Sequence, residues 1–189
     1  MRLLTCFKVK KAIVISAVLA FSAGLWGGPG QGWSLDRDLL KDAGMDEIGA
    51  EAPDFTLKAP SGKRLTLREN RGRVVVIHVW ATWCKPCKDE FPQFEKMHRA
   101  FKDNGVVFFP VAIDKNAGAK ELGAFAKGLG ATFDVYAAGE GDITDKYWGM
   151  GVPVTYLVDK KGFIAARAIG PRDWGGEAFS SLIRALLNE

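Results

Sequence analysis

Two cysteines, Cys84 and Cys87, stand where a predicted strand leads directly into a predicted helix. Residues 74–80 form an apolar run that is typical of a strand buried on both faces. Residues 85–102 place apolar side chains at three- and four-residue spacing, which predicts a helix. Cys84 then lies at the helix N-terminus, where free N–H groups and the helix dipole stabilise a thiolate. Because a thiolate is the attacking group in thiol–disulfide exchange, this pattern predicts a redox-active cysteine pair.

Other uses of a closely spaced cysteine pair fit this chain less well. A structural zinc site takes four ligands, yet the remaining cysteine and the two histidines, Cys6, His78 and His98, are scattered along the sequence. Covalent haem attachment requires a histidine directly after the second cysteine, where this chain has Lys88. A structural disulfide across so short a loop contributes about 2 kcal/mol, against about 3 kcal/mol for a fifteen-residue loop. We therefore favour a redox pair, with neither a metal nor another cofactor.

The N-terminal segment differs in composition from the rest of the chain. Its first eleven residues contain four basic residues and no acid, and residues 12–26 are uncharged and mostly apolar. This order is typical of a secretory signal peptide, although an uncleaved membrane anchor fits it as well. We predict a signal peptide or anchor over residues 1–27, a linker over 28–48, and one domain over 49–189, whose length of about 140 residues is normal for a single core.

Charge and cysteine usage agree with export. The chain has 26 basic and 22 acidic residues, but the four basic residues of the N-terminal segment account for the whole excess. We therefore predict no nucleic-acid surface. Cys6 lies in the basic segment, so the exported part contains only Cys84 and Cys87. A single thiol pair suits an exchange enzyme in an oxidising compartment, since no third thiol can scramble its disulfide.

The remaining pattern predicts an α/β fold. A hairpin, strands 55–57 and 64–67, precedes the cysteine strand, and Pro92 is expected to kink or split the cysteine helix. A mixed central sheet with helices on both faces follows from the order of the elements. The further predicted strands are 106–113, 133–136, 154–158 and 163–169, and the further predicted helices are 35–43, 117–129, 143–148 and 174–187.

Four stretches carry a resemblance to a known family: residues 52–57 (Ala-Pro-Asp-Phe-Thr-Leu), 79–87, 90–92 and 151–159. Through them the chain resembles TlpA/ResA/CcmG-like proteins, which are exported bacterial thiol–disulfide oxidoreductases with a thioredoxin fold. The resemblance begins at about residue 49 and continues to the C-terminus. Peroxiredoxins share the opening motif, but they use one peroxidatic cysteine in a different motif.

The residues of the cysteine motif suggest their roles. Cys84 is the expected attacking thiolate, with the cationic Lys85 beside it, and Cys87 is the expected resolving thiol. Pro86 is tolerated early in the helix, where its missing N–H would lack a partner. Glu90 lies three residues after Cys87 on the same helix face and could take its proton. The resemblance implies an active-site glutamate here, while the alternative is an acid favoured by the helix dipole.

Three further positions are candidates for the site. The resemblance implies a cis bond between Val152 and Pro153, which would offer backbone groups to an extended substrate; the alternative is a trans proline at a strand start. Trp83 is expected on an apolar rim for the substrate, and Trp80 in the core. His78 departs from the family, because thioredoxins carry a buried aspartate there and exported relatives often asparagine. It is either a proton shuttle with a pKa near neutrality or a neutral core histidine.

The function expected from these residues is exchange of thiols and disulfides in the periplasm. The family resemblance implies protein disulfide substrates, apocytochrome c thiols among them, and electrons from a membrane thiol donor. The protein would be free after signal cleavage or anchored through residues 12–26. The alternative is a thioredoxin-fold binding, adaptor or copper-handling module without turnover.

Overall fold

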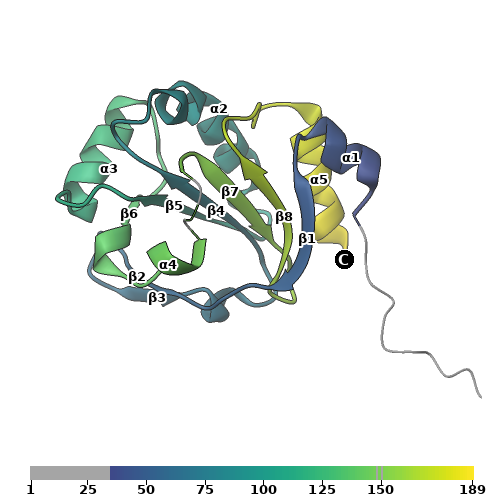
Figure 1. The fold of residues 1–189 in the computed structure, drawn as a ribbon, viewed down its shortest axis with the longest axis horizontal. Coiled ribbons are helices and arrows are strands. Elements are labelled where there is room, and N and C mark those ends of the chain that lie inside the picture. Colours follow the sequence, from purple (N-terminus) through teal and green to yellow (C-terminus); the bar gives the residue numbers. More distant parts are fainter. Residues whose placement is uncertain (1–34, 148, 150) are drawn as a thin grey trace, which may run out of the picture. The chain divides into compact units, whose positions relative to one another are not determined.

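A six-stranded mixed sheet forms the centre of the structure, a computed structural model that describes residues 35–147, 149 and 151–189. Its strands are β1 (Asp46–Glu51), β4 (Val74–Trp80), β5 (Val106–Ala112), β6 (Tyr136–Ala137), β7 (Val154–Val158) and β8 (Phe163–Ile169). They lie in the order β1-β8-β7-β4-β5-β6 (Figure 1). β4, β5 and β6 are parallel, whereas β7 is antiparallel to β4 and β8, and β1 is antiparallel to β8.

β4 is the central strand, and all seven of its residues are buried. Because strand side chains alternate between the two faces, β4 contributes to two separate apolar cores. Val74, Val76 and Trp80 belong to the first core, and Val75, Ile77 and Val79 to the second. His78 lies an even number of residues from each member of the first group, so its side chain points to the same face of the sheet. The alternation therefore directs a polar imidazole towards the first core.

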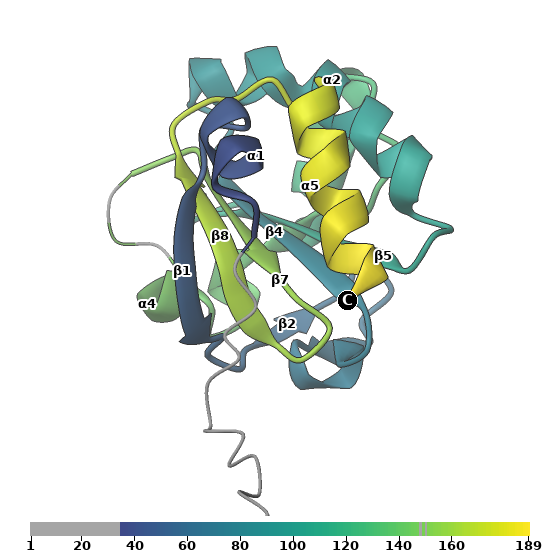
Figure 2. The same ribbon diagram turned by 90° about the vertical axis from the view of Figure 1, so that its right-hand side faces the viewer.

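Helices cover the first face of the sheet. They are α1 (Arg37–Asp42), α2 (Lys85–Phe101), α3 (Ala119–Gly128) and α5 (Glu177–Asn188). Phe91 and Phe94 of α2, and Phe179 and Leu182 of α5, are among the buried side chains of the first core. Figure 2 shows α1, α2 and α5 on the same side of the sheet. The face that receives His78 is therefore the one on which α2 packs.

A hairpin and a short helix cover the second face. The hairpin consists of β2 (Thr56–Lys58) and β3 (Arg64–Thr66), and the helix is α4 (Thr144–Tyr147). Phe55 and Leu57 pack there against Phe109, and Phe55 also meets the ring of Tyr147 edge to face, with centroids 5.5 Å apart. Two short 3₁₀ turns, Arg68–Asn70 and Ala138–Glu140, flank these elements.

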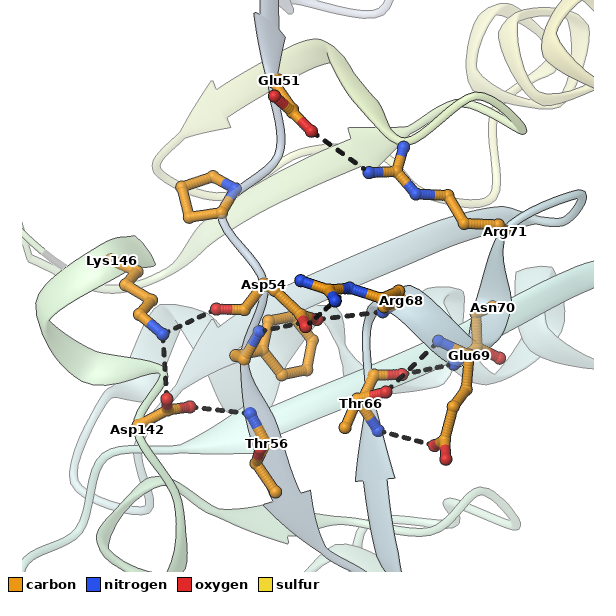
Figure 3. A network of polar contacts seen from close by, with 12 residues as sticks. Glu51, Asp54, Thr56, Thr66, Arg68, Glu69, Asn70, Arg71, Asp142 and Lys146 are labelled. Atoms are coloured by element: carbon orange, nitrogen blue, oxygen red, sulfur yellow. Dashed lines mark hydrogen bonds and ion pairs between the residues drawn. The ribbon is translucent and has the colours of Figure 1, made fainter.

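A polar network holds the hairpin in place (Figure 3). Asp54 accepts from the backbone N–H of Arg68 at 3.0 Å, and Asp142 accepts from that of Thr56 at 2.7 Å. Lys146 of α4 donates to the carbonyl of Asp54 at 2.6 Å and to Asp142 at 2.9 Å. These bonds fix the Ala-Pro-Asp-Phe stretch against α4, the last helix before the Val152–Pro153 loop.

The folded unit begins before residue 49. Residues 28–48 were predicted to be a linker, but α1 and most of β1 lie within that range. β1 pairs with β8, and α1 packs against α5. Helix α1 agrees with the helix predicted over residues 35–43, whereas β1 is an exposed edge strand whose only half-buried side chain is Ile48. Without a buried alternating face, β1 gives no pattern by which a strand can be recognised.

The cysteine helix is continuous. α2 spans Lys85–Phe101 with Pro92 inside it, so of the two expected effects of Pro92, a kink or a split, the split does not occur. The predicted hairpin, strands 106–113, 154–158 and 163–169, and the later helices agree with the structure to within a few residues at their ends, whereas the strand predicted over 133–136 shares only Tyr136 with β6. The expected signal peptide or anchor lies outside the described residues. Within the described part of the chain, no helix is long and apolar enough to cross a membrane.

Candidate active site

The cysteine pair lies at the junction of β4 and α2, as its sequence context predicts. Cys84 is the N-cap residue of α2, and its sulfur accepts the backbone N–H of Cys87 at 3.2 Å. Pro86 occupies the second helical position, where its missing N–H leaves no bond unmade. The first turn contains no acid. A thiolate at Cys84 would therefore receive a hydrogen bond and the positive end of the helix dipole with no opposing carboxylate in that turn.

The two sulfurs form a disulfide, with Cα atoms 5.3 Å apart. Cys87 is completely buried, whereas Cys84 retains 5% of its surface. Of the two cysteines, only Cys84 retains some exposed surface. The neighbouring Trp83 is 66% exposed, which is unusual for so large an apolar side chain, and Trp80 is fully buried. Trp80 therefore lies in the core as predicted, and Trp83 is exposed, while its part in a substrate rim stays a prediction.

Lys85 points along the helix surface. Its ammonium lies 2.6 Å from the carboxylate of Asp89 one turn later, and both side chains are exposed. The positive charge expected beside Cys84 is therefore paired with a carboxylate. The N-terminus of α2 and the N–H of Cys87 remain as the groups that stabilise a thiolate at Cys84.

Asp114 braces the loop that carries Trp83. Its carboxylate accepts from the backbone N–H of Thr82 at 3.1 Å and from the hydroxyl of Thr82 at 2.5 Å. Asp114 follows the end of β5, next to β4 in the sheet. A groove runs beside this loop, lined by Thr82, Trp83, Ile113, Asp114, Lys115, Asn116, Ala117 and Glu121.

The peptide bond between Val152 and Pro153 is cis, as the family resemblance implies. β7 begins directly after Pro153 and is antiparallel to β4, with Val154 opposite Val79. The Val152–Pro153 loop therefore lies beside the end of β4 that leads to Cys84. The carbonyl of Pro153 accepts from Gly170 at 2.8 Å. Among the described residues, none forms a backbone hydrogen bond with Val152.

Glu90 lies in the buried interior behind the disulfide. Only 4% of its surface is exposed. Burial raises the pKa of Glu90 to about 7, and the shift is partly offset by the backbone N–H of Arg172, which donates to Oε2 at 3.1 Å. A dipole-favoured surface acid would be exposed and fully ionised. Glu90 is instead buried with a pKa raised towards neutrality, which fits the expected general acid–base better than a dipole-favoured surface acid.

His78 is a neutral buried histidine. It is 1% exposed, and its Nδ1 lies 2.9 Å from the hydroxyl oxygen of Thr155 on β7. Burial lowers the pKa of His78 to about 3. The imidazolium form that a proton shuttle near neutrality needs is therefore strongly disfavoured, which agrees with the neutral, hydrogen-bonded alternative. Its Nε2 lies 3.3 Å from Oε1 of Glu90.

Four residues around the site were not singled out in the sequence. Arg172 and Trp174 precede α5 and contribute to the surroundings of Glu90, Thr155 contacts His78, and Asp114 holds the loop before Cys84. Asp114 could have been found, because it stands just after a buried strand that is parallel to the cysteine strand. The other three depend on contacts between elements that are distant in the sequence.

Comparison with known proteins agrees with this geometry. Residues 48–167 match the AhpC/TSA family. The thioredoxin-like protein YneN of Bacillus subtilis is 36% identical over 140 residues, which cover 74% of this chain and 81% of YneN. The thiol–disulfide oxidoreductase ResA of the same organism is 33% identical over 132 residues, covering 68% of this chain and 72% of ResA.

Solved structures show the same fold. A candidate thiol:disulfide interchange protein DsbE from Chlorobium tepidum superposes with a TM-score of 0.65 at 30% identity, covering 75% of this chain and 98% of that protein. StoA from Bacillus subtilis superposes with a TM-score of 0.57 at 26% identity, covering 74% and 99%.

The thioredoxin fold and the Cys84–Cys87 pair define an enzyme of the thiol–disulfide oxidoreductase class. Within that class, the chain belongs to the AhpC/TSA family and is of the TlpA/ResA/CcmG-like type.

Proposed function

We propose that this oxidoreductase reduces disulfides of proteins in the periplasm, with Cys84 as the attacking sulfur. The observation that carries the proposal is the position of Cys84 as N-cap of α2, with its sulfur facing the N–H of Cys87 beside an exposed Trp83. The proposed direction of electron flow rests on the family resemblance alone. Thioredoxin-fold proteins have reduction potentials from about −270 mV to about −120 mV, so the direction is a property to be measured.

The reaction has two exchange steps. In the reduced protein, the Cys84 thiolate attacks one sulfur of a substrate disulfide, and the other substrate sulfur leaves as a thiolate that takes up a proton. Cys87 then loses its proton and attacks the sulfur of Cys84. The second substrate sulfur leaves as a thiol, two electrons have passed to the substrate, and the Cys84–Cys87 disulfide of the present structure is formed.

Glu90 is proposed as the proton acceptor for Cys87. The two residues are one turn apart on α2, and both are buried. An ordinary thiol has a pKa of about 8.5 and an ordinary glutamate about 4.3, which makes the glutamate a weak base towards a thiol. With its pKa at about 7, Glu90 comes closer to the thiol in basicity while staying partly ionised at neutral pH.

An extended segment of the substrate is proposed to lie across Trp83, Pro86 and the Val152–Pro153 loop. Trp83, in the loop before Cys84, and Pro86, in the first turn of α2, are both exposed. Val152 is half-buried and packs against the core that contains the cysteines, and its backbone groups are offered to an added strand. Lys85, which is paired with Asp89, is proposed to lie at the edge of this surface.

Export and the electron donor complete the proposal. The basic and apolar order of residues 1–26 supports secretion or anchoring, and the absence of a third cysteine from the exported sequence supports an oxidising compartment. A membrane dithiol donor would reduce the Cys84–Cys87 disulfide after each cycle, becoming a disulfide itself. Apocytochrome c thiols are the substrate that the family resemblance implies.

A trapping experiment tests the assignment of the cysteines. Reduced Cys87→Ser protein is mixed with insulin, and stable mixed disulfides are counted by mass spectrometry. We expect them with Cys87→Ser and not with Cys84→Ser, because only Cys84 is reachable from outside. Equal trapping by both variants would refute the roles.

The direction of electron flow and the alternative function need separate measurements. The equilibrium potential of the Cys84/Cys87 couple against glutathione distinguishes a reductant near −270 mV from an oxidant near −120 mV. Metal retained after dialysis, together with no insulin reduction by the wild-type protein, would support the copper-handling module instead.

A further inference from the structure

His78 is a buried polar residue that the reaction described above leaves unused. It extends from β4 towards α2, the helix that carries the resolving cysteine and Glu90. Its ring lies against Phe94, with centroids 4.7 Å apart, and near Trp174, with centroids 6.2 Å apart. Aromatic side chains thus surround an imidazole whose two nitrogens face two polar partners, Thr155 and Glu90.

The two nitrogens of His78 are in different situations. Nδ1 is 2.9 Å from the hydroxyl of Thr155, a normal hydrogen-bond distance. Nε2 and Oε1 of Glu90 are 3.3 Å apart, and neither atom has a hydrogen-bond partner within the described part of the chain. A buried polar atom without a partner costs about 1–3 kcal/mol. The indole N–H of Trp174 also lacks a partner among the described residues and lies near Glu90, so Nε2 of His78 is one of two donors that can satisfy Oε1.

The hydroxyl of Thr155 permits the required tautomer. A neutral imidazole has one N–H donor and one acceptor nitrogen, and a threonine hydroxyl either donates or accepts. When Thr155 donates to Nδ1, the proton of His78 resides on Nε2, the nitrogen that lies 3.3 Å from Oε1 of Glu90. The other oxygen of Glu90 already accepts the N–H of Arg172. Each oxygen of the carboxylate then has one donor.

We propose that His78 is a positioning residue that donates from Nε2 to Oε1 of Glu90 and holds this carboxylate in place to accept the proton of Cys87. The inference rests on the role of Glu90 in the proposed function. His78 stays neutral throughout and transfers no proton. Hydrogen bonds of active-site groups often tighten only when the reacting state forms, and the present structure, with its disulfide closed, shows the contact at 3.3 Å.

The other groups around Glu90 act in known directions. Arg172, from the segment between β8 and α5, favours its carboxylate through the backbone bond and through its charge. The indole N–H of Trp174, in the same segment, also favours the carboxylate as a hydrogen-bond donor, and Cys87 precedes Glu90 on α2. Since a donor to the carboxylate favours ionisation, loss of the His78 contact will raise the pH at which Glu90 becomes a base.

Two substitutions separate the contacts of His78. The amide nitrogen of glutamine reaches about as far as Nε2 of histidine, so His78→Gln keeps a donor for Glu90. Asparagine is shorter and reaches about as far as Nδ1, so His78→Asn keeps the Thr155 partner and loses the contact with Glu90. A role in packing alone would be disturbed by both variants, whereas a role as donor is lost only in His78→Asn.

The readout is the resolving step. Reduced protein joined through Cys84 to thionitrobenzoate is prepared, and release of the coloured thiolate by Cys87 is followed from pH 5 to 9. In His78→Asn we expect the midpoint of the pH profile to lie about one pH unit above that of the wild type, so that release below the midpoint is about tenfold slower. In His78→Gln we expect the midpoint to stay close to that of the wild type. Alkylation of Cys84 should be unchanged in both.

Glu90→Gln separates this inference from the function on which it rests. If Glu90→Gln leaves the profile unchanged, the role of Glu90 itself fails. If Glu90→Gln changes the profile and His78→Asn does not, or if His78→Asn shifts it equally in the Glu90→Gln background, the positioning role is overturned. ¹⁵N NMR of the imidazole in the reduced wild-type protein at pH 8 needs no variant. A proton on Nε2 supports the inference, and a proton on Nδ1 refutes it.

Discussion

Glu90 should make the stability of this protein depend on pH in a direction opposite to that of an ordinary carboxylate. In the folded protein, burial raises its pKa from 4.5 to about 7. The unfolded chain therefore releases the proton first as pH rises. The favourable contribution of protonated Glu90 is fully present below pH 4.5 and is lost as pH rises towards 7.

The size of the effect follows from the shift. A difference of about 2.5 pH units between folded and unfolded states corresponds to about 3 kcal/mol, at about 1.4 kcal/mol per unit. Glu90→Gln removes this titration and keeps the shape of the side chain. The free energy of unfolding of the wild type minus that of Glu90→Gln should fall by about 3 kcal/mol between pH 4.5 and 7 and then stay level.

Urea denaturation of the oxidised wild-type and Glu90→Gln proteins, at half-unit steps from pH 4 to 8.5, measures this difference. All other groups titrate in both proteins, so their contributions cancel to a first approximation. A difference that rises with pH would mean that Glu90 is ionised in the folded state at neutrality. A difference that stays constant to within about 0.5 kcal/mol would show no pKa shift at all.

Two further pairs of substitutions test the surroundings of the disulfide. Trp83→Ala should change the free energy of unfolding by less than about 0.5 kcal/mol while raising KM for insulin. Trp80 is three residues away and fully buried, so Trp80→Ala should lower the free energy of unfolding by about 3–5 kcal/mol. Asp114→Ala removes both hydrogen bonds to Thr82 and should lower it by about 2 kcal/mol. Asp114→Asn retains one acceptor oxygen, so the free energy of unfolding should fall by about half as much as in Asp114→Ala. Urea denaturation and insulin reduction check these values, and equal effects within either pair would contradict the geometry.

The parts of the fold that were predictable are those with a strong local pattern. The six apolar residues of β4, interrupted only by His78, and the spacing of phenylalanines in α2 identified both elements and placed Cys84 between them. β1 was missed because an exposed edge strand needs no buried alternation. Pro92 did not split α2, because packing of Phe91 and Phe94 against the sheet outweighs one lost backbone bond.

The candidate site was predictable along the chain but not across it. Glu90 could be assigned to the face of Cys87 from spacing alone. Its burial could not, because the residues that complete its surroundings, Arg172 and Trp174, are more than eighty positions away. The state of His78 likewise depends on Thr155, which faces it across the sheet. One sequence suggests which residues take part, while their protonation depends on contacts made only by folding.

The energetics of Glu90 and His78 favour a functional explanation over a structural one. At neutral pH a buried carboxyl with a raised pKa lowers stability, as worked out above, and an apolar side chain in its place would avoid that loss. Burial of His78 also lowers stability below the ordinary pKa of histidine, because the unfolded chain then takes up a proton that the folded protein does not bind. Two such groups lie 3.3 Å apart beneath a redox-active disulfide. Retention of both groups at a loss of stability favours a use at the disulfide, in which Glu90 takes up the proton and the neutral His78 holds Glu90 in place.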